Sequence, residues 1–145
     1  MLRDPTPLER RVEATQILLA RWQGRPFDWK KGSHCVRMAC EHLRRMGYQP
    51  PLAKAGSFSS ALGARRALQR VGVETLSEAV DLVGLPRIPP AAALPGDIVE
   101  LPGEAPGCLT IALGNGRVLG WHPDAYGAAV LQPKLYGAAW QVNPA

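Results

Sequence analysis

Apolar positions recur at helical spacing through the first part of the chain. Thr6 followed by Pro7, with Glu9 three residues after the threonine, is typical of a capping box with proline in the first helical position. The helical spacing then continues up to Gly24, which predicts a first helix. The face expected to be buried consists of Leu8, Val12, Thr15, Leu19 and Trp22.

Three further helices are expected before any clear strand. Ser33 can cap a helix that runs to about Met46 and stops at Gly47, because serine side chains cap N-termini and glycine commonly ends a helix. Its expected buried face consists of Val36, Ala39, Cys40 and Leu43. The next two helices also open on hydroxyl residues and are expected from Ser59 or Ser60 to Gly72, and from the capping box at 75–78 to Gly84.

After a proline-rich passage at 86–96 the pattern changes to short strands. Glycine and asparagine at 114–116 tolerate the backbone angles of a hairpin turn between two of them. The expected strands are 98–101, 108–113, 117–121, 130–131 and 139–142. Helices first and strands second predict an α+β fold, with N-terminal helices packed on a small C-terminal antiparallel sheet.

The length fits one domain. A chain of 145 residues, 46% apolar, can bury a hydrophobic core without disulfides or bound metal ions. We therefore expect a single domain over 1–145. Its parts are a helical half at 1–85, the proline-rich seam at 86–96 and a sheet half at 97–145. No apolar run approaches the roughly 18 residues of a membrane span, and the first residues lack the apolar stretch of a signal peptide.

Positive charge is concentrated in the first half. Residues 1–73 hold 14 Lys and Arg against 5 acids, whereas residues 74–145 hold 3 against 7. The paired arginines fall on three separate expected helices, which favours solvated helix faces or contacts with an acidic partner. With two Phe and no nucleic-acid motif, the sequence does not support sequence-specific nucleic-acid binding.

Cys35 is the main candidate for chemistry, because it stands at the expected start of a helix. Backbone N–H groups and the helix dipole stabilise a thiolate there, and a protonated His34 would add to this effect. The alternative is that Cys35 is a small buried packing residue, as free cysteines often are. Cys40, in the middle of the helix, is expected to be packing. The three cysteines do not suggest a disulfide framework, and we expect free thiols.

A thiol nucleophile needs a base, normally histidine. His42 lies two turns beyond Cys35, about 10 Å along the helix, which is too far for a hydrogen bond. His122 follows the second hairpin strand and reaches Cys35 only if the sheet packs against the start of that helix. The alternative for His122 is an ordinary surface histidine in a turn. Because no histidine or cysteine pair has ligand spacing on one helix, we expect no metal ion and no cofactor.

Three segments resemble a known family. They are Trp-x-x-Gly-x-x-Cys at 29–35, Pro-Gly-Asp-Ile-Val at 95–99, and Ile-x-Leu-Gly-Asn-Gly-Arg-Val at 111–118. Together they resemble the NlpC-like cell-wall cysteine peptidases, a branch of the papain-like group, and a set of small tail proteins of tailed phages. The resemblance implies an α+β fold with a nucleophile helix packed on a small antiparallel sheet, and it maps the nucleophile onto Cys35.

The sequence departs from the family at the other catalytic positions. His34 stands before the nucleophile where the family usually has Asp. The base of the family's His-Val-Gly-Ile segment falls on Cys108, and the third polar residue falls on Gly120. A thiol and a glycine cannot perform these roles, so the triad implied by the resemblance is broken. His122 shares a strand face with Gly120 and is the candidate substitute base.

Three hypotheses follow from the resemblance and its departures. The first is a phage tail component at the tail tip or baseplate, mainly structural, with a degenerate and inactive NlpC-like fold. The second is an active cysteine peptidase or amidase of peptidoglycan peptides, with Cys35 as nucleophile and His122 or His34 as base. The third is a tail assembly factor. The expected partners are other tail proteins of the hub or distal tail, with peptidoglycan as a further possibility, and the expected location is the virion after synthesis in the host cytoplasm.

Overall fold

Helix α1 begins at the capping box expected from the sequence. In the computed structural model, which describes residues 3–54, 58–103 and 108–145, α1 spans Pro7–Trp22. The Thr6 hydroxyl accepts the N–H of Glu9, and the Glu9 carboxylate accepts the N–H of Thr6. Both partners satisfy donors that the first helical turn would otherwise leave unpaired.

The buried face of α1 differs from the expected one. Leu8 is 51% exposed, and Val12 and Leu19 are only partly buried. The buried residues are Arg11, Ala14, Thr15, Leu18 and Trp22. Thr15 and Trp22 are buried as predicted, whereas Leu8, Val12 and Leu19 are not, because the buried ion pair of Arg11 with Asp97 turns the side of α1 that carries Arg11 towards the sheet.

Helix α2 spans Cys35–Arg45 and packs against both α1 and the sheet. All four residues of its predicted buried face are buried. Its N-cap is His34 and not Ser33: the His34 Nδ1 accepts the N–H of Arg37 at 3.2 Å. Ser33 instead pairs with Asp28 through the backbone and donates its hydroxyl to the Pro26 carbonyl at 2.6 Å. That turn holds Ser33 outside the helix, so the cap moves by one residue.

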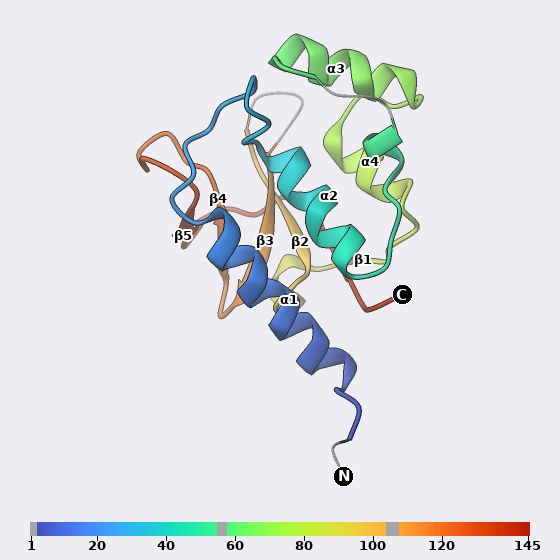
Figure 1. Ribbon diagram of the computed structural model, residues 1–145, viewed down its shortest axis with the longest axis vertical. Helices are drawn as coiled ribbons and strands as arrows, with labels where there is room; N and C mark the ends of the chain where they lie inside the picture. The colour runs from blue at the N-terminus through green and yellow to red at the C-terminus, as the bar shows by residue number, and fades with distance from the viewer. Residues whose placement is uncertain (1–2, 55–57, 104–107) are drawn as a thin grey trace.

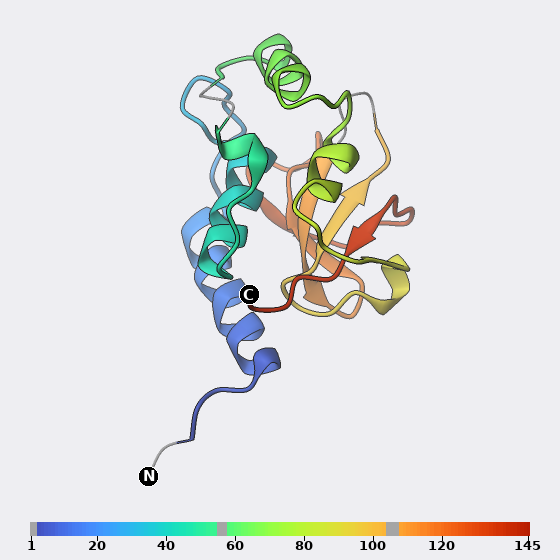
Figure 2. The same ribbon diagram turned by 90° about the vertical axis from the view of Figure 1, so that its right-hand side faces the viewer.

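Two shorter helices follow a 3₁₀ turn at Pro51–Lys54. Helix α3 spans Ala61–Arg70 and is capped by Ser60, and α4 spans Leu76–Asp81 and is capped by Thr75. Helix α4 ends at Asp81, before the expected stop at Gly84. Figures 1 and 2 show α3 at the end of the molecule opposite the N-terminus.

The sheet has six antiparallel strands in the order β1-β6-β2-β3-β4-β5. Their bounds are β1 Arg87–Ile88, β2 Ile98–Leu101, β3 Cys108–Gly114, β4 Arg117–Gly120, β5 Ala129–Leu131 and β6 Ala139–Trp140. Strand β1 and a 3₁₀ turn at Pro90–Ala92 lie within the proline-rich seam, so the seam supplies an edge strand. Strand β6 stops before the expected position because the N–H of Val142 donates to the Asp97 carboxylate.

The helices lie on one face of this sheet, which confirms the α+β class. Figure 2 shows α1 and α2 side by side at the left, with the strands to their right. The main core lies between these layers and includes Leu18, Trp22, Met38, Ile111 and Trp140. A smaller cluster of Val99, Ala112, Val118 and Ala139 lies on the opposite face. None of the described helices is long and apolar enough to cross a membrane.

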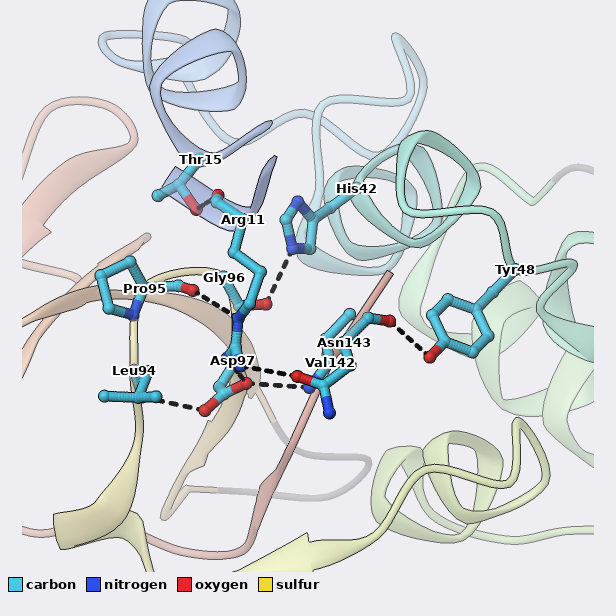
Figure 3. Close-up of polar contacts among 10 residues, drawn as sticks. All are labelled: Arg11, Thr15, His42, Tyr48, Leu94, Pro95, Gly96, Asp97, Val142 and Asn143. Carbon is cyan, nitrogen blue, oxygen red and sulfur yellow. Dashed lines mark hydrogen bonds and ion pairs between the residues drawn. The ribbon is translucent and has the colours of Figure 1, made fainter. Parts of the chain in front are cut away.

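Buried polar contacts join α1, β2 and the C-terminal segment (Figure 3). The Arg11 guanidinium pairs with the Asp97 carboxylate, and it also donates to the Pro95 carbonyl at 3.1 Å and to Asn143 Oδ1 at 3.0 Å. Asp97 accepts the backbone N–H groups of Leu94 and Val142, both at 2.8 Å. The Pro-Gly-Asp segment therefore holds the helical layer against the sheet.

Candidate functional site

A cavity of about 500 Å³ lies where the start of α2 meets the start of β3. The thiols of Cys35 and Cys108 line it, together with His122 from the loop after β4. Its walls are mainly apolar and aromatic, and they include Phe27, Trp29, Val36, Leu76, Trp121 and Tyr126. The structure thus brings together three residues that the sequence analysis took from separate segments.

Cys35 is the first residue of α2 and is buried. A hydrogen bond with the Cys108 thiol is the main cause that lowers the pKa of Cys35. Burial raises this pKa, while the backbone N–H groups of Leu109, Cys35 and Val36 lower it further. The helix start and one strand amide therefore converge on the Cys35 sulfur, as expected for a site that stabilises a thiolate.

Cys108, the first residue of β3, is the partner in this pair. Its pKa is raised, first by the hydrogen bond with Cys35 and then by burial and by the charges of Cys35 and Glu100. The Cys108 sulfur also lies 4.0 Å from the Leu109 carbonyl oxygen, which is a much weaker acceptor than a thiolate. At neutral pH Cys108 therefore keeps its proton and donates it toward Cys35.

The aromatic wall of the cavity is held by side-chain and backbone contacts. Phe27 packs edge-on against Trp29 and Trp121, with ring centroids 5.1 and 5.7 Å apart. The Trp121 indole donates to the Arg25 carbonyl at 2.8 Å, which fixes the ring where β4 ends. Tyr126 is 89% exposed at the rim. The cavity is thus open to solvent on the side of the loop after β4.

The side chain of His34 caps the N-terminus of α2. Its ring lies between Trp29 and Phe58, with centroids 4.9 Å from each. Burial, and then the nearby charge of Arg37, lower the pKa of His34 to about 4. The imidazole is therefore neutral at pH 7, and its Nδ1 lone pair already accepts the N–H of Arg37. His34 supplies neither a positive charge nor a free base to Cys35.

His122 lies at the exposed rim of the cavity. Its Nδ1 accepts the N–H of Asp124 at 3.1 Å, and the Asp124 carboxylate lies 3.6 Å from the same nitrogen. Strand β4 ends at Gly120, so His122 lies in the loop beyond the strand, where it lines the cavity together with Cys108. Among the described residues, no hydrogen bond joins the His122 ring to Cys35.

Gly120, the position of the third polar residue in the resembling family, has no room for a side chain. It is buried and pairs with Ala129 in β5. A Cβ at this position would lie 2.6 Å from Thr110 Cγ2, and Thr110 is fixed by a hydrogen bond to the Val99 carbonyl at 2.7 Å. Thr110 therefore occupies the space that an orienting side chain would need.

The remaining candidates lie away from the cavity. Cys40 is buried in the middle of α2, and burial raises its pKa to about 11, which fits its expected packing role. The buried His42 donates from Nε2 to the Gly96 carbonyl at 2.8 Å, within the contacts of Figure 3. In the part of the chain that the structure describes, no three His, Cys, Asp or Glu side chains gather as metal ligands would.

Comparison with known proteins identifies a family. The family model described as Domain of unknown function (DUF6950) matches residues 8–142, which include every helix and strand described above from Leu8 onward. The chain belongs to this family. None of the curated proteins compared with the chain matches it.

Two relationships at the centre of the DUF6950 domain were not predicted. The contact of Cys108 with Cys35 joins residues that are far apart in the sequence, and only the alignment of Cys108 with a catalytic position pointed to it. The ion pair of Arg11 and Asp97 was missed because a charged residue in a helix is normally assigned to the solvent face. Asp97 did carry a signal, since it follows Pro95 and Gly96 directly before a buried strand.

Proposed function

We propose that this domain is a mainly structural component of a phage tail, at the tail tip or baseplate, built on an NlpC-type papain-like fold without hydrolytic machinery. The three segments that resemble the NlpC-like peptidases and the small tail proteins support the proposal. An α+β fold in which Cys35 opens a helix packed on an antiparallel sheet is compatible with that architecture. The observation that carries the proposal is the thiol of Cys108 at the position of the family's base.

The chemistry of the cysteine pair argues against peptide hydrolysis. A general base must accept the proton of the nucleophile and later deliver it to the leaving group. Cys108 instead donates a hydrogen bond to Cys35, and its raised pKa keeps it protonated at neutral pH. Gly120 offers no orienting group, and Thr110 fills the adjacent space. Of the three positions, only the nucleophile is present.

The outer face of α3 is the proposed contact with neighbouring tail proteins. Arg65, Arg66 and Arg70 are exposed on it, and Leu62 is 56% exposed beside them. Such a face suits an acidic partner surface with an apolar patch. Helix α3 also lies at one end of the molecule (Figures 1 and 2), which leaves its outer face accessible to a partner.

Quantitative mass spectrometry of purified particles, from the phage or prophage that encodes the chain, tests this proposal. We expect the protein in a fixed ratio to the tail proteins. We also expect the double variant Arg65→Glu and Arg66→Glu to lower its incorporation at least tenfold. Arg10→Glu, an exposed change on α1, is the matched control and should leave incorporation unchanged. Absence of the wild-type protein from finished particles would instead favour a tail assembly factor.

A cysteine peptidase or amidase is the second candidate, and the location of His122 favours it. The ring lines the same cavity as Cys35, and the Asp124 carboxylate lies 3.6 Å from its Nδ1. Hydrolysis of a peptidoglycan stem peptide by the purified protein tests this candidate. We expect no turnover above that of Cys35→Ala. Turnover that Cys35→Ala abolishes and Cys40→Ala retains would replace the structural proposal with an enzymatic one.

A further inference from the structure

Two thiols from different layers of the fold meet at the floor of the cavity. Cys35 comes from the first turn of α2 and Cys108 from the first residue of β3, and both are free. Both thiols line the same open cavity, and each of them shifts the pKa of the other. A hydrolytic site has no use for a second thiol here, whereas thiol–disulfide exchange needs two sulfurs in contact.

We propose that Cys35 and Cys108 form a reversible intramolecular disulfide by exchange with a low-molecular-weight disulfide such as oxidised glutathione. The cavity of about 500 Å³ gives such a reagent access to the sulfurs. The proposal does not depend on the function proposed above, because it concerns the two thiols alone.

The exchange takes place in two balanced steps. In the first, the Cys35 thiolate attacks one sulfur of the small disulfide, a mixed disulfide forms on Cys35, and one small thiolate leaves. In the second, Cys108 loses its proton to that thiolate or to solvent and attacks the Cys35 sulfur, and the second small thiolate leaves. Overall, two protein thiols are oxidised and one small disulfide is reduced to two small thiols.

The environments of the two thiols suit these separate roles. Three backbone N–H groups and the Cys108 thiol lower the pKa of Cys35, which favours Cys35 over Cys108 as the attacking thiolate. Cys108 remains protonated until the mixed disulfide has formed, since removal of the Cys35 charge also removes the main cause of its raised pKa. Cys108 is then placed to resolve the intermediate.

Cys40 provides an internal comparison. It lies on the same helix as Cys35 but is buried in the core, and burial raises its pKa to about 11. It has no contact with the cavity of Cys35 and Cys108 among the residues that line it. A specific disulfide therefore excludes Cys40, whereas non-specific oxidation would involve all three cysteines.

Closing the disulfide would join the start of α2 to the start of β3 covalently. The link would restrict the unfolded chain across the segment between residues 35 and 108, so the oxidised protein should unfold at a higher temperature than the reduced one. It would also remove both free thiols from the cavity floor.

Equilibration of the full-length protein in buffers of reduced and oxidised glutathione tests the proposal. After acid quenching, mass spectrometry of the intact protein and of its peptides locates each disulfide. We expect a monomer that has lost two hydrogens, a linked peptide pair containing Cys35 and Cys108, a free Cys40, and full reversal by excess reduced glutathione.

Two variants separate the steps, and each is compared with Cys40→Ser. Cys108→Ser should stop at a glutathione adduct on Cys35, and Cys35→Ser should form neither product at a comparable rate. Cys40→Ser should behave as the wild type does. The wild-type measurement alone is decisive if a variant fails to fold: no disulfide in any buffer, a disulfide that involves Cys40, or only disulfides between chains would overturn the proposal.

Discussion

Arg11 and Asp97 form an ion pair that is almost completely buried between α1 and the start of β2. Each partner has further hydrogen bonds, Arg11 with Pro95 and Asn143, and Asp97 with backbone N–H groups. Such full pairing is what allows charges to remain inside a protein. The pair therefore fixes how the helical layer sits on the sheet, and with it the approach of Cys35 to Cys108.

Removal of one partner of this ion pair should strongly destabilise the protein. Arg11→Met leaves the Asp97 carboxylate buried without its cation, and we expect a loss of about 3–5 kcal/mol in the free energy of unfolding. Urea denaturation followed by circular dichroism measures this loss. The exposed pair of Arg3 and Glu9 is the control, and Arg3→Ala should leave the free energy of unfolding nearly unchanged. Equal effects of the two substitutions would contradict the structural role given to Arg11.

Stability should fall in mild acid because of His34. The folded-state pKa of His34 is lowered from 6.5 to about 4, so between these values the unfolded chain binds more protons than the folded one. The free energy of unfolding should therefore decrease as the pH falls from about 7 to about 4, by on the order of 2 kcal/mol from this residue.

Urea denaturation at several pH values checks the effect of His34. In His34→Asn, which retains a capping side chain without a titrating ring, the free energy of unfolding should depend less on pH over this range. The pKa of His42 is also lowered by burial, and its contribution is present in both proteins. An unchanged pH dependence in His34→Asn would show that the His34 ring is protonated as readily in the folded state as in the unfolded one.

Substitution of Gly120 should destabilise the sheet through Thr110. A Cβ at Gly120 would lie 2.6 Å from Thr110 Cγ2, so Gly120→Ala should lower the free energy of unfolding by about 1–3 kcal/mol. Thr110→Ser keeps the hydroxyl that bonds to Val99 and removes the crowded methyl group, so it should recover part of the loss in the double variant. Gly103→Ala, with no atom within 4 Å of its Cβ, is the control for thermal denaturation measurements.

The pH dependence of Cys35 alkylation should change when Cys108 is replaced. The Cys108 hydrogen bond is the main cause of the lowered pKa of Cys35, so Cys108→Ala should raise this pKa. The pH at which iodoacetamide labelling of Cys35 reaches half its maximal rate should lie below 9.0 in the wild type and move upward in the variant. Peptide mass spectrometry measures the rate at each pH. Cys40 is the internal control, because its raised pKa should keep its labelling slow in both proteins.

Local sequence patterns determined most of the secondary structure. The capping residues Thr6, Ser60 and Thr75 each begin the helix expected of them, and the glycine-rich turn at 114–116 joins β3 to β4 as predicted. These features depend on neighbouring residues in the chain, so the sequence contains the relevant contacts. The shift of the α2 cap from Ser33 to His34 occurred because a backbone bridge between Asp28 and Ser33 competes with the helix.

The candidate site was predicted only in part. Cys35 at the start of a helix is a local feature, and the structure places it there. Whether His122 or Cys108 would face it depended on how the β3–β4 pair packs against α2, which no spacing in the sequence specifies. His34 is adjacent to Cys35 in the sequence, yet its ring points into the stack of Trp29 and Phe58.

The sequence by itself determined the order of helices and strands, the α+β class and the position of a thiol at a helix start, because caps, turns and apolar spacing act over a few residues. The tertiary structure alone decided which face of α1 is buried and which group lies against Cys35. Those outcomes depend on the pairing of Arg11 with Asp97 and of Cys35 with Cys108, residues more than 70 positions apart. Such contacts form only once the helices have packed on the sheet, so no short stretch of the sequence specifies them.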